Sequence, residues 1–158
     1  MNIITLLNAM RDAVADDADT KTWCQAQYGS DHQVLVGLDR RRPPEAESDY
    51  PLVHLYPGME TEGYELEEET VVINASCGIY DTANLSGLSD NITQMQGIGN
   101  VVAFRGYVRA AIAGASLGSV FIHRIESLYD TVEFYPAFIV TLRITIGAPY
   151  SLGGDPFP

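Results

Sequence analysis

The chain has 158 residues, of which 46% are hydrophobic and 19% are charged, a composition typical of one folded domain and not of a disordered chain. Its formal net charge is −12, from 21 acidic and 9 basic residues, which excludes nucleic-acid binding through a general basic surface. No apolar run approaches the roughly 20 residues of a membrane span, and the first residues form no basic signal-peptide region, so we expect a cytoplasmic protein.

The N-terminal residues predict two helices. The first helix is expected over residues 3–15, because apolar side chains recur there at helical spacing: Ile3, Leu6, Leu7, Met10 and Val14. A second, short helix is expected to run through Trp23 to Tyr28, with Asp19 or Thr20 as its cap, Gly29 at its end and Trp23 in the core.

Three strands are predicted next, over residues 33–38, 51–56 and 70–80. Pro57-Gly58 is expected to end the second of them, because proline and glycine are typical of turns. In the third strand every second residue is apolar, so one face of the strand carries Val71, Ile73, Ala75, Cys77 and Ile79.

Two strongly charged segments separate these strands. The loop after residue 38 contains Arg40, Arg41 and Arg42, and in so acidic a chain such a basic loop needs a negative partner. That partner could be the glutamates of a neighbouring copy, or nucleic-acid phosphates gripped by many copies in a ring. The second segment holds Glu60, Glu62, Glu65, Glu67, Glu68 and Glu69. It is most simply a solvated loop and strand start, although its last three glutamates could bind a divalent cation.

The second half of the chain predicts one helix and two strands. Residues 81–99 are polar and glycine-rich and could contain a short helix after Ser89 or Asp90. A clearer helix is predicted from Asn100 to about residues 114–118, and a fourth strand over residues 120–127. The apolar stripe of the helix comprises Val101, Phe104, Val108, Ile112 and Ala115.

Residues 131–146 predict a long fifth strand, which would reach about 50 Å at roughly 3.3 Å per residue. We therefore expect it to project past its own domain and to meet another subunit. Pro136 implies an edge position, a bulge or a bend. One face of this strand is apolar and carries Val132, Phe134, Phe138, Val140, Leu142, Ile144 and Ile146.

The order of elements predicts an α+β fold, with an antiparallel or mixed sheet of about five strands, helices packed on one face and a long C-terminal β-hairpin. We expect a single domain over residues 1–146. Residues 147–158, rich in glycine and proline, are expected to form a C-terminal arm.

Signatures of catalysis are missing from the sequence. His32, His54 and His123 have no neighbours at metal-ligand spacing, and Cys24 and Cys77 are expected to be buried free thiols. Residues 97–100, Gly-Ile-Gly-Asn, could hold an anion before a helix, although a plain capping turn explains them as well. We expect no cofactor, no metal and no enzymatic activity.

The layout resembles the tail-terminator, or tail-completion, proteins of long-tailed bacteriophages. The resemblance covers the N-terminal helix, the short helix ending in Tyr28-Gly29, and a strand introduced by Asp49-Tyr50-Pro51. It continues with an acidic hairpin, a single later helix, and a closing hairpin that contains Glu126-Ser127-Leu128 and Tyr135-Pro136-Ala137-Phe138.

This resemblance implies a virion protein of the tail or neck, assembled in the bacterial cytoplasm. Members of that family form hexameric rings that cap the tail tube, end its polymerisation and present a surface to the head-side connector. DNA would pass through the channel without specific binding, and six copies at −12 would carry 6 × −12, about −72.

Interface residues follow from the same hypothesis. We expect contacts with a neighbouring protomer or the tube from Arg40, Arg41, Arg42, Glu67, Glu68, Glu69, Tyr135 and Arg143. The acidic residues Glu60, Glu62 and Glu65 are expected to face the lumen or a partner. The alternatives are another ring component of the neck or tail, such as a tube or connector subunit, and, more remotely, an enzyme with a carboxylate-bound metal.

Overall fold

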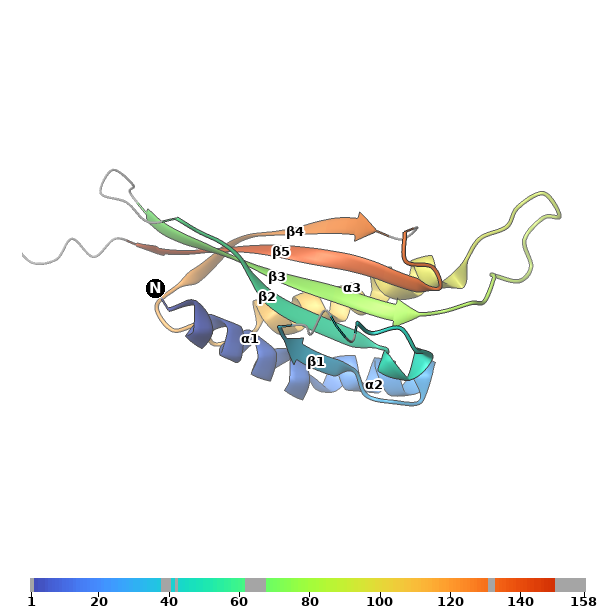
Figure 1. The fold of residues 1–158 in the computed structure, drawn as a ribbon, viewed down its shortest axis with the longest axis horizontal. Helices are drawn as coiled ribbons and strands as arrows, with labels where there is room; N and C mark the ends of the chain where they lie inside the picture. Colours follow the sequence, from blue (N-terminus) through green and yellow to red (C-terminus); the bar gives the residue numbers. More distant parts are fainter. Residues whose placement is uncertain (1, 38–40, 42, 62–67, 131–132, 150–158) are drawn as a thin grey trace, which may run out of the picture.

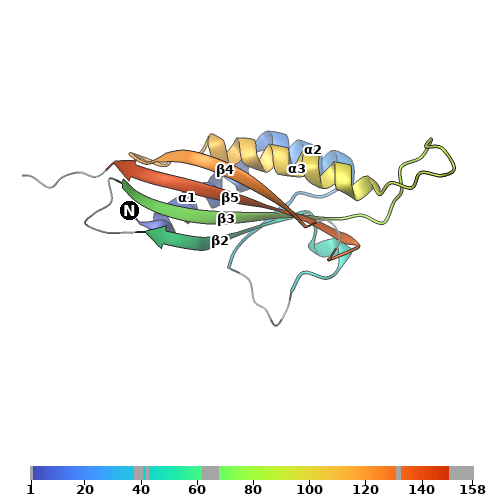
Figure 2. The ribbon, with the colours of Figure 1, turned by 90° about the horizontal axis from the view of Figure 1, so that it is seen from above.

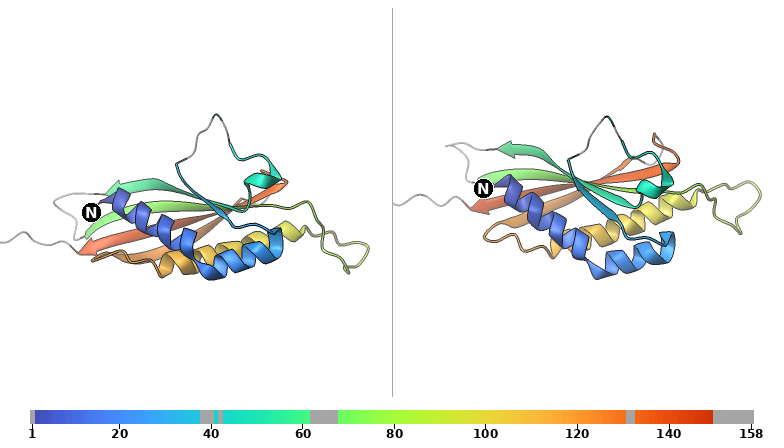
Figure 3. Two further views of the ribbon diagram at one scale, coloured as in Figure 1. Left: turned by 90° about the horizontal axis from the view of Figure 1, so that it is seen from below. Right: turned by 60° about the horizontal axis from the view of Figure 1, so that its bottom comes forward.

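The computed structural model describes residues 2–37, 41, 43–61, 68–130 and 133–149 (Figure 1). In chain order the elements are α1 (Ile3–Asp16), α2 (Ala18–Tyr28), β1 (Gln33–Val36), the 3-10 helix η1 (Glu47–Asp49), β2 (Leu52–Thr61), β3 (Glu68–Tyr80), α3 (Gln96–Ala113), β4 (Phe121–Asp130) and β5 (Ala137–Pro149). Within the described residues, the five strands form one sheet in the order β1-β2-β3-β5-β4; β1 is parallel to β2, and the other neighbours are antiparallel. The helices α1, α2 and α3 lie on one face of the sheet (Figures 2 and 3), which confirms the predicted α+β class with a mixed sheet.

The core lies between the helices and one face of the sheet. Alternation places every second side chain of the central strands in it, so the period of two predicted for β3 and for most of β5 is confirmed. The buried strand residues are Val53, Leu55, Val71, Ile73, Ala75, Cys77, Ile79, Phe138, Val140, Leu142, Ile144 and Ile146. The helices add Leu6, Leu7, Met10, Val14, Val101, Phe104, Val108 and Ile112.

Two further predictions about the core are confirmed. Trp23 packs against it, with its ring stacked on Phe104 at a centroid distance of 5.7 Å. Cys24 and Cys77 are both buried free thiols. Burial raises the pKa of each thiol to about 12, so both are protonated at neutral pH.

The first two helices meet at Asp17. Its Oδ1 accepts hydrogen bonds from the backbone N–H of Thr20 at 2.7 Å and from the Thr20 hydroxyl at 2.6 Å, so Asp17 caps α2. The helix therefore begins at Ala18, and the prediction of Asp19 or Thr20 as its cap was wrong. Gly29 ends α2 in the left-handed region, with φ 70°, as the sequence predicted.

Strand β2 continues through Pro57 and Gly58, where the sequence predicted its end. A bulge between Pro57 and Met59 shifts the register against β3 and accommodates the proline. A Cβ on Gly58 would lie only 2.8 Å from Asn74 Nδ2, so glycine allows the bulged chain to pack closely against β3. As a result β2 extends to Thr61.

Strand β5 starts later and ends later than predicted. Residues 133–136 form a turn, closed by the Ala137 N–H donating to the Phe134 carbonyl at 2.8 Å, and the strand then runs 13 residues to Pro149. Residues 147–149, which we assigned to the arm, therefore belong to the sheet. Of the three explanations for Pro136, the edge position is excluded, because β5 pairs with β3 on one side and β4 on the other; Pro136 lies in the turn before the strand.

Residues 81–95 contain no helix after Ser89 or Asp90. They leave the sheet as a projection at the end of β3 (Figure 1), which a bridge between Asn84 and Met95 closes near its base. The Gln96 N–H donates to the Ala83 carbonyl at 2.9 Å, which positions the start of α3. That helix begins at Gln96, ahead of the predicted Asn100.

Candidate interaction surface

The face of the sheet opposite α1, α2 and α3, here called the open face, has no α-helix over it within the described residues; the loop that contains η1 lies at one end of it (Figure 2). It carries the side chains that alternate with the core residues, and the strand register arranges them in rows across the sheet. One row contains Glu126, Arg143, Asn74 and Tyr56, and the next contains Leu128, Thr141, Ser76 and His54. Residues distant in sequence thus form one continuous surface.

A pocket of about 510 Å³ opens on this face, here called the open-face pocket. Residues of β2, β3 and β5 form its floor: Leu52, His54, Ser76, Gly78, Tyr80, Ala137, Ile139 and Thr141. Two other segments complete it, residues 43–45 with Tyr50 after β1, and Phe134 with Pro136 before β5. Most of the lining is aromatic, proline or aliphatic, so the pocket suits an apolar group.

Hydrogen bonds hold the segment between β1 and β2 in place beside the pocket. The Asp49 carboxylate accepts hydrogen bonds from the backbone N–H groups of Glu45 at 3.0 Å and Ala46 at 2.9 Å, and the Tyr50 hydroxyl donates to the Pro44 carbonyl at 3.2 Å. The Tyr50 ring then lies on Gly78, where an added Cβ would come within 2.9 Å of it. The loop is therefore fitted to β3.

The polar groups of the pocket are few. Ser76 and Thr141 share a hydrogen bond of 2.8 Å between their hydroxyls. His54 stacks on Tyr56 at a centroid distance of 4.8 Å, and its Nε2 has no hydrogen-bond partner within the described part of the chain. Burial lowers the pKa of His54, because the pocket disfavours the charged imidazolium. The pocket therefore presents a neutral ring at physiological pH.

A second feature of this surface is the edge strand β4. It pairs with β5 on one side and with no strand of the described residues on the other. Three large side chains on it are exposed: Phe121 (46%), Leu128 (57%) and Tyr129 (54%), of which Tyr129 lies on the helix side, where its hydroxyl accepts a hydrogen bond from Arg105 of α3. A bulge lies between Ile122 and Arg124, but the register is regular from Arg124 to Asp130. An edge of this kind is a template for pairing with another chain.

Arg143 lies in the middle of the open face, between Asn74 on β3 and Glu126 on β4. Glu126 forms an ion pair of 3.2 Å with Arg124 on its own strand. Tyr135, also predicted as an interface residue, is exposed in the turn before β5, and its ring meets Phe138 edge-on at 6.2 Å. Both predicted residues thus lie near the open-face pocket.

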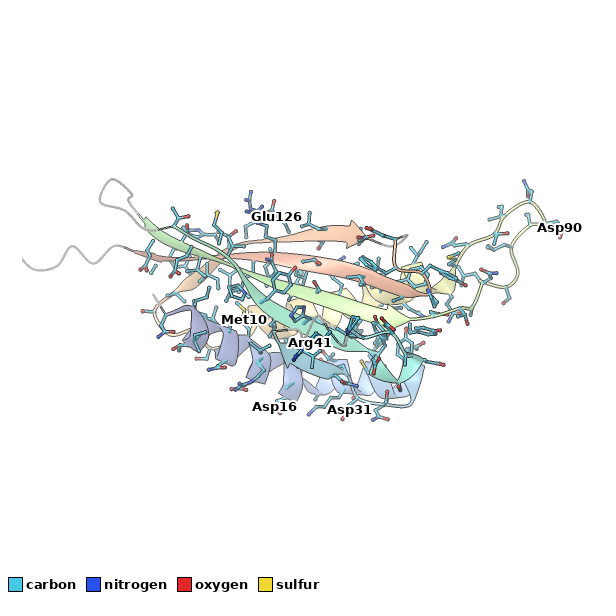
Figure 4. All side chains as sticks on the ribbon, in the orientation of Figure 1. Met10, Asp16, Asp31, Arg41, Asp90 and Glu126 are labelled. Carbon is cyan, nitrogen blue, oxygen red and sulfur yellow. The ribbon has the colours of Figure 1, made fainter. Side chains whose placement is uncertain are left out.

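The charged segments lie elsewhere. Arg41, labelled in Figure 4, is exposed in the loop between β1 and η1, two residues before the pocket residue Pro43. Glu60 and Glu69 lie at the far end of the sheet, where Glu69 is opposite Ala148. Glu68 begins β3, and its side chain lies outside the described part of the chain. Also outside the described residues are Arg40, Arg42, Glu62, Glu65 and Glu67.

The sequence did not indicate the open-face pocket or the exposed residues of β4. The pocket combines three segments distant in the chain, so no local spacing could reveal it. The turn signal at Pro43-Pro44 and the aromatic Tyr50 were visible in the sequence, but nothing there placed them over β3.

The residues considered for other chemistry have structural roles. His32 is buried, and its Nε2 lies 2.8 Å from the Val14 carbonyl. Residues 97–100 lie inside the first turns of α3 and do not precede it, and the Asn100 amide donates to Asp81 at 2.9 Å. Within the described residues, no three His, Cys, Asp or Glu side chains are grouped so that they could hold a metal ion.

A scan against models of known protein families found no match, and a search of curated proteins found no related sequence. In the described part of the chain, no helix is both long and apolar enough to span a membrane.

Proposed function

We propose that this protein is a ring-forming structural component of a bacteriophage tail, a terminator that caps the tail tube and joins it to the head-side connector. The observation that carries the assembly part of the proposal is the edge strand β4, with its exposed Phe121, Leu128 and Tyr129. The resemblance of the element order to tail terminators supplies the identity of the partners.

The physical basis is the cost of an uncovered strand edge. Unpaired backbone groups beside exposed apolar side chains favour pairing with another chain, and monomeric proteins usually block such edges. The β4 edge differs from the opposite edge, β1, which has only four residues. If β4 of one copy contacts a different surface of the next, the contact is heterologous, and heterologous contacts generate closed rings or open filaments.

The negative net charge of the chain supports a central channel whose wall does not bind DNA. The chain carries −12, and Glu60 lies at the end of the sheet where β2 meets β3. Glu60, Glu62 and Glu65 would repel DNA in a channel or contact a partner. We propose that Arg40, Arg41 and Arg42, with Glu67 to Glu69, contact a neighbouring protomer or the tube.

A tube or connector subunit is the second candidate, because the same edge strand would serve it. The two candidates differ in closure, since a tube subunit polymerises into open filaments and a terminator stops at one ring.

The experiment is the solution mass of the purified protein by light scattering, followed by negative-stain imaging of the same peak. A closed ring of about six copies with a central hole, which binds one end of isolated tail tubes, is the expected result. Filaments would favour the tube subunit. A monomer that remains a monomer when tail tubes are added would overturn the proposal.

A further inference from the structure

The open-face pocket has the chemistry of a site for a proline-rich peptide. Its lining includes the aromatic rings of Tyr50, Tyr80 and Phe134 and the rings of three prolines, Pro43, Pro44 and Pro136. Grooves lined by aromatic residues bind extended Pro-rich segments, because such segments lose little conformational entropy when they are bound.

The chain itself contains a segment with matching chemistry. Residues 150–158 read Tyr-Ser-Leu-Gly-Gly-Asp-Pro-Phe-Pro, which places Phe157 between two prolines. The only charged side chain of this segment is Asp155. An apolar, proline-flanked aromatic side chain would bury well in an apolar pocket of about 510 Å³.

The aromatic rings of the pocket in the same copy are too far away for Phe157, because Tyr50 lies on Gly78, which pairs with Ile139. Ile139 in the pocket floor lies ten residues before Pro149, and β5 at about 3.3 Å per residue makes this about 33 Å. Phe157 lies eight residues beyond Pro149, and eight extended residues span at most about 29 Å, even before the chain reverses its direction. A pocket within reach must therefore belong to another copy.

We propose that residues 150–158 of one copy bind the open-face pocket of a neighbouring copy, with Phe157 between the aromatic rings of Tyr50, Tyr80 and Phe134. The inference concerns contacts between copies and does not depend on a phage origin.

The test is disulfide crosslinking between two full-length variants that carry different tags. One variant is Pro158→Cys, which keeps Phe157, and the other is Glu45→Cys, at an exposed residue that lines the pocket. Cys24 and Cys77 are buried and will not interfere. The expected result is a crosslinked pair that carries both tags.

The matched control is Asp16→Cys in place of Glu45→Cys. Asp16 is an exposed acid away from the pocket, at the lower margin in Figure 4, so this variant should not crosslink.

Variants in the arm and in the pocket test the specific contacts. Phe157→Ala in the arm, or Ile139→Glu in the pocket floor, should lower the crosslinked fraction about ten-fold or more. Thr145→Glu, on the same face of β5 and outside the pocket, should leave it unchanged.

Two outcomes would overturn the proposal. One is the absence of a two-tag product, which would leave the pocket to a different ligand. The other is a disulfide formed within single chains that carry both Pro158→Cys and Glu45→Cys. Ring formation is measured separately by solution mass, so either failure leaves the proposal based on β4 standing.

Discussion

Gly97 lies in the first turn of α3 against the core residue Phe138. An added Cβ would overlap the Phe138 ring, including a Cζ contact of 2.9 Å, and that ring is fully buried. We predict that Gly97→Ala lowers the free energy of unfolding by about 1–3 kcal/mol, because the ring has no space into which it can move. Chemical denaturation would measure the loss.

The same helix offers a matched control. Gly106 is exposed, and a Cβ there would have no neighbour within 4 Å. Gly106→Ala should therefore raise stability by about 0.5–1 kcal/mol, through helix propensity alone. Equal effects of the two substitutions would contradict the close packing of α3 on β5.

His54 should make stability depend on pH. Burial lowers its pKa in the folded state, so on acidification the unfolded chain takes up a proton first, at its ordinary pKa of about 6.5. The stabilisation is therefore complete above that pH and is lost as the pH falls from there through the lower pKa of the folded state. We predict a drop in the urea midpoint between pH 7.5 and pH 5.5 that His54→Gln reduces.

If His54→Gln leaves the drop unchanged, carboxylates and not the pocket imidazole cause it.

At the scale of elements, β4 is the strand whose exposed side chains are expected to hold a partner. Leu128 is 57% exposed, so Leu128→Arg should cost the fold little and weaken association of copies about ten-fold or more. Sedimentation velocity would measure association, and circular dichroism the fold.

Leu88→Arg provides the comparison, since Leu88 is also exposed but lies on the projection of residues 81–95. It should associate as the unsubstituted protein does. Equal weakening by both substitutions would point to added charge and not to the β4 edge.

The sequence predicted the elements well and their ends poorly. The buried face of β3 and the buried face of α1 could be predicted, because apolar side chains recur along the sequence with the period of a strand or of a helix. The ends depended on distant partners: β2 crosses Pro57 because a bulge against β3 allows it, and α2 starts early because Asp17 caps it. Such pairings leave no local pattern.

At the scale of the whole molecule, the order of strands and the open-face pocket could not be derived from the sequence. The insertion of β5 between β3 and β4 excludes the edge position, which was one of the three alternatives for Pro136. Of the predicted interface residues, Arg143 and Tyr135 lie beside the pocket, whereas Glu60 and Glu69 lie at the far end of the sheet. The residue types alone suggested which side chains contact a partner, but not which of them lie together on the folded surface.

Net charge leads to a prediction about assembly. Copies at −12 repel one another, and exposed ion pairs offset little of this repulsion. Raising the salt concentration from about 0.01 M to about 0.1 M shortens the screening length from about 30 Å to about 10 Å, so association should become tighter. Light scattering across a salt series would measure it. Weaker association at higher salt would instead indicate that attraction between the arginine loop and glutamates dominates.

The long axis of the sheet has chemically different ends. Glu60 and Glu69 lie at one end, and the projection of residues 81–95, with Asp90 near its tip in Figure 4, leaves the other. Copies related by a single rotation axis all point the same way. If the sheet lies along that axis, the assembly acquires a top and a bottom, and only one of its rims would match any given partner. The direction in which such an assembly binds a tube would then be set by the two different ends of each single chain.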